Sequence, residues 1–464
     1  MKKLLAFLLA AVLVLGLFGC GGAEEAKKPE GLLTGFGKVD ITPAGTVHLQ
    51  GGDWANRRSN GLLDLLFVTC VAIQEGDTTV LLYTMDFKVA TDNFVDPAKA
   101  AVSAATGVPQ EYILFNATHT HSATALRYKW DGVENHKNNF TAAAVNAATA
   151  AIADLSPTEI YAGSTQTENM TFVRHYVDAT GQVVLRTDPA LKAHYREADG
   201  EMQLVKFARS AEDKKDILLM SFPSHATFNE GGLEISADYP SPTRDYVEAN
   251  SDCLVAFFQG ASGNQTPDSR VPGMAKNSSD YRTYGQKLGQ YAVDALPTLT
   301  KVEGQSIKLN SRNFTAGTNK KNTDKLVAAK DVVAISQQFG RNSAEEKAAL
   351  EKYGFAMYLE ASWTITRANL DPTMTMELKT FSVGDLSFVI APYEMFGHNG
   401  TDIKTQSVFD NTFLITCSEG AFNYIASTDA FDFNSYESYC CYFEQGTAEK
   451  LVTEYLDMLA ELKQ

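Results

Sequence analysis

Two histidines separated by one residue are the first candidates for chemistry. The chain has eight histidines, and His119 and His121 lie in residues 116–122, NATHTHS, directly after the apolar run Tyr112–Phe115. That run is typical of a buried strand. If the strand continues, residues i and i+2 lie on one face, so the two imidazoles are neighbours. Such a pair can bind one metal ion together, or one imidazole can bind it while the other transfers protons.

Three more candidates stand in or directly after apolar runs. His225 follows Asp216–Phe222, Glu394 follows Leu386–Ala391, and Tyr424 lies within residues 422–427, FNYIAS. Singly, each is also compatible with a structural role: a core histidine, a charge in the first turn of a helix, or a packed phenol. An acid after a buried strand can equally be a ligand, because α/β sheets place their sites at the carboxyl ends of strands.

The elements that would position these residues alternate between strand-like and helix-like runs, which predicts one large α/β domain over residues 33–464. A hairpin is expected where Leu65–Ile73 and Thr79–Met85 are split by Glu75–Asp77. Residues 317–360 are rich in Lys, Asp, Glu and Ala at helical spacing, which indicates a helical insertion. Further strands are expected at Asp216–Phe222, Cys253–Phe258, Thr373–Val383 and Leu386–Ala391, and helices at Phe140–Leu155, Ser278–Leu296 and Thr447–Gln464.

Composition narrows the function classes. The 464 residues are 44% hydrophobic and 21% charged, which excludes a disordered, collagen-like or coiled-coil chain. Lys plus Arg is 40 against 56 for Asp plus Glu, a formal net charge of −16, so nucleic acid is not an expected partner. The six cysteines include no Cys-x-x-Cys, so neither a thiolate zinc site nor a dithiol redox site is indicated.

The first residues are typical of a targeting signal rather than of a folded domain. Lys2 and Lys3 precede the apolar run Leu4–Phe18, which is typical of a secretory signal peptide over residues 1–19. Residues 17–20, LFGC, resemble the bacterial lipoprotein box, which implies lipidation of Cys20. Residues 20–32 are small and charged, as expected of a flexible tether. We therefore expect export and a lipid anchor on the outer face of a bacterial cell membrane.

Several short motifs stand in a fixed order along the chain. They are residues 35–43 (GFGKVDITP), 49–52 (LQGG), 117–122 (ATHTHS), 224–227 (SHAT), 258–267 (FQGASGNQTP) and 392–394 (PYE), followed by Tyr424 and residues 435–437 (SYE). In type and order they resemble the neutral (alkaline, non-lysosomal) ceramidases, which are zinc amidases. The first and third motifs are specific, and the others support them. The resemblance covers roughly residues 34–445.

The resemblance implies a zinc ion held by His119, His225, Glu394 and Tyr424. Zinc at such a site would lower the pKa of water toward about 7, giving a nucleophile for an amide carbonyl. By the same resemblance His121 would transfer protons and stabilise the tetrahedral intermediate.

The oxyanion side of the reaction is also implied by the resemblance. Arg174 and Tyr436 would stabilise the developing oxyanion or the carboxylate product, although an arginine at position 174 is also compatible with a surface ion pair. Thr266 stands where the family has a serine and keeps a hydroxyl, so it is a further catalytic candidate.

Other departures limit what can be carried over. Asn264 replaces an aspartate, and Tyr393 replaces a glycine, which would put bulk beside Glu394. The chain ends soon after the last motif, so we expect no C-terminal immunoglobulin-like domain. The expected fold is a single large layered sandwich of mixed β-sheets flanked by helices.

The leading hypothesis is zinc-dependent hydrolysis of a linear amide, with an N-acyl lipid such as ceramide as the first candidate. The same metal centre acting on another amide or an ester is an alternative. A solute-binding lipoprotein without catalysis is a second alternative. Residues 260–263, GASG, do not form the Gly-x-Ser-x-Gly elbow of a serine hydrolase. The expected partners are a small-molecule or lipid amide and, through the anchor, a membrane.

Overall fold

The computed structural model describes residues 31–51, 57–184, 191–271 and 280–464. The expected signal peptide, Cys20 and most of the tether lie outside the described residues, as does Gly52 of the second motif. None of the helices in the described ranges is both long and apolar enough to cross a bilayer.

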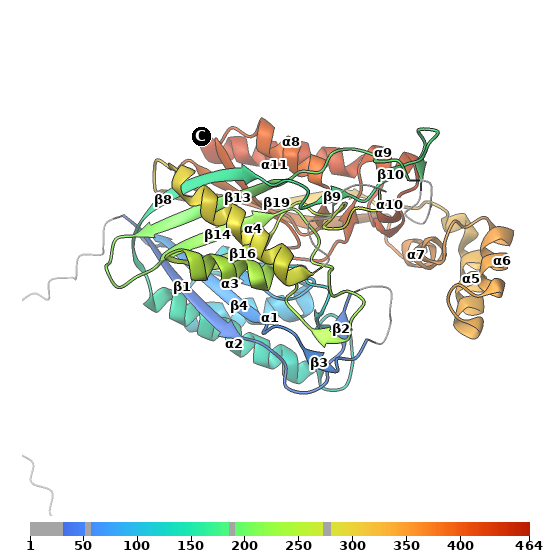
Figure 1. The fold of residues 1–464 in the computed structure, drawn as a ribbon, viewed down its shortest axis with the longest axis horizontal. Coiled ribbons are helices and arrows are strands. Elements are labelled where there is room, and N and C mark those ends of the chain that lie inside the picture. Colours follow the sequence, from blue (N-terminus) through green and yellow to red (C-terminus); the bar gives the residue numbers. More distant parts are fainter. Residues whose placement is uncertain (1–30, 52–56, 185–190, 272–279) are drawn as a thin grey trace, which may run out of the picture.

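The larger sheet has nine strands in the described part of the chain and mixes both strand directions (Figure 1). Its order is β16-β14-β13-β8-β1-β4-β5-β6, with β18 beside β8. The pairs β14/β16 and β5/β6 are parallel, and the other pairs are antiparallel. The predicted hairpin forms between β4 and β5. The strands are β1 (Leu32–Asp40), β4 (Phe67–Glu75), β5 (Thr78–Met85), β6 (Ile113–Ala117), β8 (Ser156–Gln166), β13 (Glu201–Arg209), β14 (Asp216–Phe222), β16 (Cys253–Gln259) and β18 (Thr300–Lys301).

Both faces of this sheet are covered, which explains the continuous apolar runs of its strands. In β14, Ile217 and Leu219 face the inner core, whereas Leu218 and Met220 pack among residues of α3 and α4. The same alternation in β4 and β5 buries one face against α1 and α2. These covering helices are α1 (Asp92–Thr106), α2 (Val133–Ala153), α3 (Pro240–Asn250) and α4 (Tyr281–Ala295).

A second sheet of order β19-β20-β21-β23 packs on the inner face of the first. Its Phe381, Phe388 and Phe413 share one core with Leu219 and Phe258 of the larger sheet. Helices α8 and α11 cover its outer face. The elements are β19 (Ile307–Gly317), β20 (Thr373–Val383), β21 (Leu386–Ile390), β23 (Asn411–Ile415), α8 (Gly397–Gln406) and α11 (Thr447–Lys463). The expected layered sandwich of mixed sheets flanked by helices is confirmed.

The edges of the larger sheet approach each other, because polar side chains link β5 and β6 to β16. The Thr84 hydroxyl donates to the Phe257 carbonyl, and Asn116 Oδ1 accepts from the Gln259 amide at 3.4 Å. Thr416, just after β23, donates its amide to the Gln259 carbonyl at 2.8 Å. The carboxyl ends of β6, β16 and β23 therefore lie together, and the loops that follow them can meet.

Helices α5 (Leu326–Phe339), α6 (Ala344–Tyr353) and α7 (Tyr358–Ala368) form a lobe at one end of the molecule (Figure 1). They overlap residues 317–360, where helices were expected, and the last helix extends beyond that range. Helix α6 begins at the N-cap Ser343, which accepts from the Glu346 amide, and ends at Gly354, whose φ of 66° suits a left-handed C-cap. The lobe has its own small core, which includes Val332 and Phe355.

Short strand pairs and helical turns fix the loops around the sheet ends. The strand pairs are β2 (Leu49–Gln50) with β7 (Ala123–Thr124), β3 (Gly61–Leu62) with β15 (Glu234–Ile235), β9 (Phe172–Val173) with β17 (Gln265–Thr266), β22 (Glu394–Met395) with β24 (Tyr424–Ile425), and β10 (Tyr176–Val177) between β11 (Val183–Val184) and β12 (Ala193–His194). The remaining helices are α9 (Thr428–Asp432), α10 (Tyr436–Cys440) and the 3-10 turns Gln110–Tyr112, Leu296–Thr298 and Thr323–Lys325.

Candidate metal centre and active site

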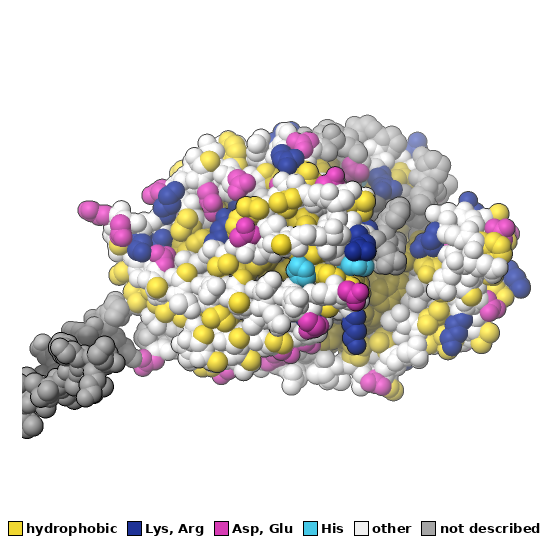
Figure 2. All heavy atoms as spheres, turned by 90° about the horizontal axis from the view of Figure 1, so that it is seen from below, with side chains coloured by type: hydrophobic (Ala, Val, Ile, Leu, Met, Phe, Trp, Pro, Cys, Tyr) yellow, Lys and Arg dark blue, Asp and Glu magenta, His cyan; other side chains and the backbone are white. Residues whose placement is uncertain are grey.

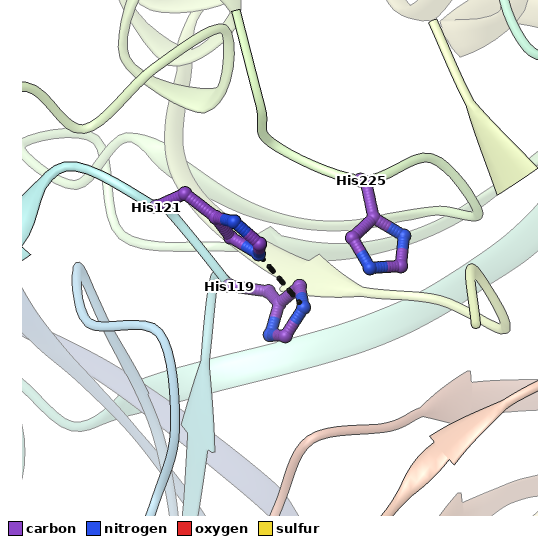
Figure 3. A group of neighbouring side chains, drawn as sticks. All are labelled: His119, His121 and His225. Atoms are coloured by element: carbon purple, nitrogen blue, oxygen red, sulfur yellow. Dashed lines mark hydrogen bonds between the residues drawn. The ribbon is translucent and has the colours of Figure 1, made fainter. Parts of the chain in front are cut away.

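His119 and His121 meet through a turn and not through a continuing strand. Strand β6 ends at Ala117, and His119 has a φ of 64°, in the left-handed region. The expectation that the strand continues through both histidines is therefore wrong, because the His119 amide donates to the Phe87 carbonyl, which lies outside the β5/β6 ladder. The two Nε2 atoms nevertheless lie 3.3 Å apart, and His225 is beside them (Figure 3).

The backbone fixes the ring orientation of the two predicted histidine ligands. His119 Nδ1 lies 2.7 Å from the Lys88 carbonyl, and His225 Nδ1 lies 2.8 Å from the Ser262 carbonyl. A carbonyl can only accept, so each Nδ1 carries a proton and each Nε2 is directed at the cluster. This is the arrangement that orients a histidine toward a metal.

Glu394 and Tyr424 reach the same point from a parallel strand pair. They lie opposite each other in the β22/β24 pairing. Glu394 Oε2 is 3.3 Å from His119 Nε2 and 3.1 Å from His225 Nε2. The Tyr424 hydroxyl is 3.5 Å from His225 Nε2. The structure thus brings together all four residues that the sequence resemblance predicts as ligands.

The donor set fits zinc in chemistry and in spacing. Two ligands at tetrahedral zinc, each about 2.1 Å from the metal, are about 3.4 Å apart. The three measured separations that involve Glu394 or Tyr424 span 3.1 to 3.5 Å. The nitrogen donors of His119, His121 and His225 also lie within 4.8 Å of one another, so position alone permits His121 as a ligand too.

The charge balance favours a cation at this point. Burial disfavours ionisation of Glu394, but His119 and His225 outweigh that cost and hold its pKa well below the usual range. Burial lowers the pKa of His225 to about 4. Burial also acts to lower the pKa of His119, but Cys417 and Glu394 together raise it to about 10. A proton on His119 therefore compensates the buried carboxylate, and a bound metal would take its place.

His121 has an acidic partner that sequence reasoning missed. Its Nδ1 lies 2.6 Å from Glu230 Oε1. Burial opposes the charge of Glu230, but His121 holds the pKa of that carboxyl well below its usual range. Burial and then Lys88 lower the pKa of His121. Glu230 stands in the short polar loop 229–232 (NEGG), and no motif marks it.

Arg57 holds that loop against the histidine segment. Its guanidinium donates to the Gly232 carbonyl at 2.6 Å and to the His121 carbonyl at 2.7 Å. The side chain is buried, so these charge-assisted bonds are shielded from water. Arg57 therefore fixes the relative position of His121 and Glu230, and sequence reasoning missed it as well.

Arg174 is part of a buried network in the site and is not a surface ion pair. Its Nε donates to Glu437 Oε1 at 2.7 Å, and Nη2 donates to the Gly263 carbonyl at 2.9 Å. The guanidinium lies over the rings of Tyr424 and Tyr436, at 5.3 and 5.6 Å from their centroids. The other Glu437 oxygen lies 2.8 Å from His175 Nε2. Glu437 and His175 were not anticipated from the sequence, although residues 435–437 were part of a motif.

The residues that depart from the motifs have clear positions. Thr266 pairs with Phe172 in the β17/β9 ladder, and Asn264 Oδ1 accepts from the Gly397 amide at 3.0 Å. Tyr393 does not put bulk beside the ligands: it packs in the core with Tyr455 of α11. That expectation is corrected.

A cavity of about 780 Å³ opens onto this cluster. His121, Arg174, Thr266, Glu394, Tyr424 and Tyr436 all line it. Met357, Leu359 and Trp363 bring the helical lobe to its wall. Figure 2 shows the surface hollowed between the main body and the lobe, with hydrophobic side chains in the hollow. The volume suits a ligand of the size of a small amphiphile.

Comparisons with known proteins bear on the fold. No protein-family model and no curated protein matched the chain. Among solved structures, neutral ceramidase from Pseudomonas aeruginosa aligns with a TM-score of 0.70 at 18% identity, over 94% of this chain and 75% of that one. A ceramidase complexed with C2 aligns with a TM-score of 0.70 at 17% identity, over 94% of this chain and 76% of that one. The chain therefore has the neutral ceramidase fold, as the motifs predicted.

Proposed function

We propose that this protein is a zinc-dependent hydrolase of linear amides, with an N-acyl lipid such as ceramide as the first candidate substrate. The observation that carries the proposal is the convergence of His119, His225, Glu394 and Tyr424, of which Glu394 and Tyr424 line the cavity. The names of the two structural neighbours support ceramide as the compound to test first.

His119, His225, Glu394 and Tyr424 would hold the metal, which would supply Lewis acidity and a water of lowered pKa. The chain's own residues would do the rest. His121, oriented by Glu230, would accept a proton from the attacking water and give it to the leaving amine. Its position, with Nε2 facing the ligand cluster and Nδ1 against the carboxylate, suits both steps.

Arg174 and Tyr436 would stabilise the negative charge that develops on the carbonyl oxygen and then the carboxylate product. Glu437 fixes the arginine side chain, so little reorganisation is needed during the reaction. Thr266 lines the cavity, and its hydroxyl would orient the substrate. The same arrangement could act on another amide or an ester, and the substrate panel below separates these.

The experiment is release of fatty acid or amine from a panel of N-acyl compounds and the matching esters, with and without a chelator. We expect amide cleavage that a chelator abolishes and zinc restores. Unaffected turnover in the chelator would refute the metal centre. About one zinc per chain without turnover of any compound would leave metal binding intact but refute the hydrolase. Absence of both zinc and turnover would favour a solute-binding lipoprotein.

We further propose that the protein is exported and anchored to the outer face of a bacterial membrane through a lipid on Cys20. The lipoprotein-box resemblance of residues 17–20 supports this. Cys20→Ser should move the protein from the membrane to the soluble fraction. Membrane retention of that variant would contradict the anchor.

A further inference from the structure

Three cationic side chains line the cavity without an ionic partner of their own. Lys88 follows β5, Arg127 follows β7, and Arg270 follows β17. Across the described ranges, no ion pair or hydrogen bond engages any of these three side chains. Lys88 and Arg127 are half-buried, and Arg270 is exposed. A half-buried cation without a partner has lost part of its hydration, and no ion pair or hydrogen bond offsets that cost.

Among the described residues, no acid that lines the cavity forms an ion pair with these cations. Glu394 faces His119 and His225, Glu437 binds Arg174 and His175, and Glu230 binds His121. The remaining acid, Asp268, also has an interaction of its own. Four basic side chains and four carboxylates line the cavity, so its lining is electrically balanced in a chain whose net charge is −16. An anionic ligand therefore meets less repulsion here than the net charge of the chain implies, and the three cations can bind it.

The cations and the apolar wall come from different parts of the chain. Met357, Leu359 and Trp363 belong to the helical lobe and its approach, and Tyr436 belongs to α10, which contacts α7. Lys88 instead lies beside the candidate ligands, because its carbonyl accepts from His119 Nδ1 at 2.7 Å and its side chain lines the same cavity as His121 and Glu230. Under the proposed function, Arg174 and Tyr436 mark the acyl side of the scissile bond, and His121 marks the amine side.

We propose that the preferred substrates are anionic N-acyl amphiphiles, in which the amine portion carries a carboxylate, sulfonate or phosphate that Lys88, Arg127 and Arg270 bind. This inference rests on the proposed function and names its substrate class. The acyl chain would lie along the wall formed by the helical lobe. A guanidinium donates paired N–H bonds to the oxygens of a carboxylate, sulfonate or phosphate. Its hydrogen bonds to an uncharged head group are weaker, because the acceptor carries no charge.

The test uses three amides with the same acyl chain and the same two-carbon spacer: N-octanoyltaurine, N-octanoyl-β-alanine and N-octanoylethanolamine. Binding to the metal-depleted protein is measured by calorimetry at low and high salt. We expect at least one anionic amide to bind about 10-fold more tightly than the ethanolamide, the scale of one charge-assisted hydrogen bond. The advantage should shrink at high salt.

The variant Arg127→Gln with Arg270→Gln should lose that preference. Lys347→Gln, which removes an exposed cation of α6 outside the cavity, should keep it. Equal or tighter binding of the ethanolamide, or an unchanged preference in the double variant, would overturn the anion site. The comparison of the taurine and β-alanine amides shows whether a sulfonate or a carboxylate is preferred.

Turnover of the same three amides by the zinc-loaded protein separates the two proposals. Preferential anion binding without cleavage of any amide would refute the hydrolase and leave the anion site standing. Faster cleavage of the ethanolamide than of both anionic amides would refute the anionic substrate class and leave amide hydrolysis standing. Faster cleavage of an anionic amide, reversed in the double variant, supports both.

Discussion

Glu230 Oε1 lies 2.6 Å from His121 Nδ1, while His121 Nε2 faces His119 Nε2 at 3.3 Å. The carboxylate fixes the tautomer, because it can only accept the Nδ1 proton. It also stabilises an imidazolium once Nε2 has taken up a proton, as the carboxylate of a catalytic triad does. Under the proposed function, this pair is the proton-transfer group beside the proposed metal ligands.

Glu230→Gln tests this pair. The amide can still accept from Nδ1 but carries no charge, so we expect kcat to fall about 10²-fold with zinc content unchanged. Because the Glu230 charge raises the pKa of His121, and His121 must be unprotonated to accept a proton from water, its loss should move the acidic limb of the pH–rate profile to lower pH. Glu234→Gln, in a neighbouring strand, is the matched control. An unchanged rate and profile would make Glu230 structural.

Alanine variants of the two neighbouring histidines should separate metal binding from proton transfer. His119→Ala removes a donor 3.3 Å from Glu394 Oε2 and should lose most of the zinc. His121→Ala should keep the zinc and lose roughly 10²–10⁴-fold in rate, the scale of a general acid–base group. Metal analysis and single-turnover rates check both. Loss of zinc from His121→Ala would instead make it a ligand, which its position permits.

Glu437 predicts a pH-dependent contribution to stability. Burial would raise its pKa, but His175 and Arg174 hold that pKa well below the usual range. A carboxyl with a depressed folded-state pKa contributes stability above its unfolded pKa of about 4.3, and that stability is lost as the pH falls through the folded value. Glu437→Gln should therefore lower the free energy of unfolding by about 3 kcal/mol or more at pH 7.

Urea titrations of wild type and Glu437→Gln at pH 7 and at pH 3.5 measure this difference. The difference in the free energy of unfolding between the two proteins should be smaller at pH 3.5 than at pH 7. Glu377→Gln changes an exposed carboxylate and should show little effect at either pH. A gap that is as wide at pH 3.5 as at pH 7 would mean that packing, and not charge, accounts for the loss.

Sequence periodicity predicted the elements that carry the site because those elements are buried on both faces. The run Asp216–Phe222 is a strand with these bounds, since its two sets of alternating side chains enter two different cores. Helices near residues 317–360 were anticipated from composition and helical spacing. That Met357 and Trp363 line the cavity was not anticipated, because a local sequence pattern does not encode which surface a lobe faces.

The four candidate ligands came from a family resemblance, and their convergence depends on turns that periodicity does not encode. His119 was expected on a strand, yet it lies in a left-handed turn. Glu230, Arg57 and Glu437 were missed because each acts through a partner far along the chain, such as the 109 residues that separate His121 from Glu230. Single charged residues in polar loops leave no signal until the fold supplies that partner.

Gly51 lies against the backbone of His121. A Cβ built at Gly51, where φ is 147°, would be 2.2 Å from the His121 carbonyl oxygen. At Gly45, where φ is 78°, an added Cβ would meet nothing within 4 Å. In both alanine variants the strain of a positive φ should lower the free energy of unfolding by about 1–2 kcal/mol. Only Gly51→Ala must also displace His121, so only this variant should lose most of its kcat, as urea titration and steady-state kinetics can show. Equal activity in the two variants would mean that the position of His121 tolerates the shift and that its contact with Glu230 is not required at 2.6 Å.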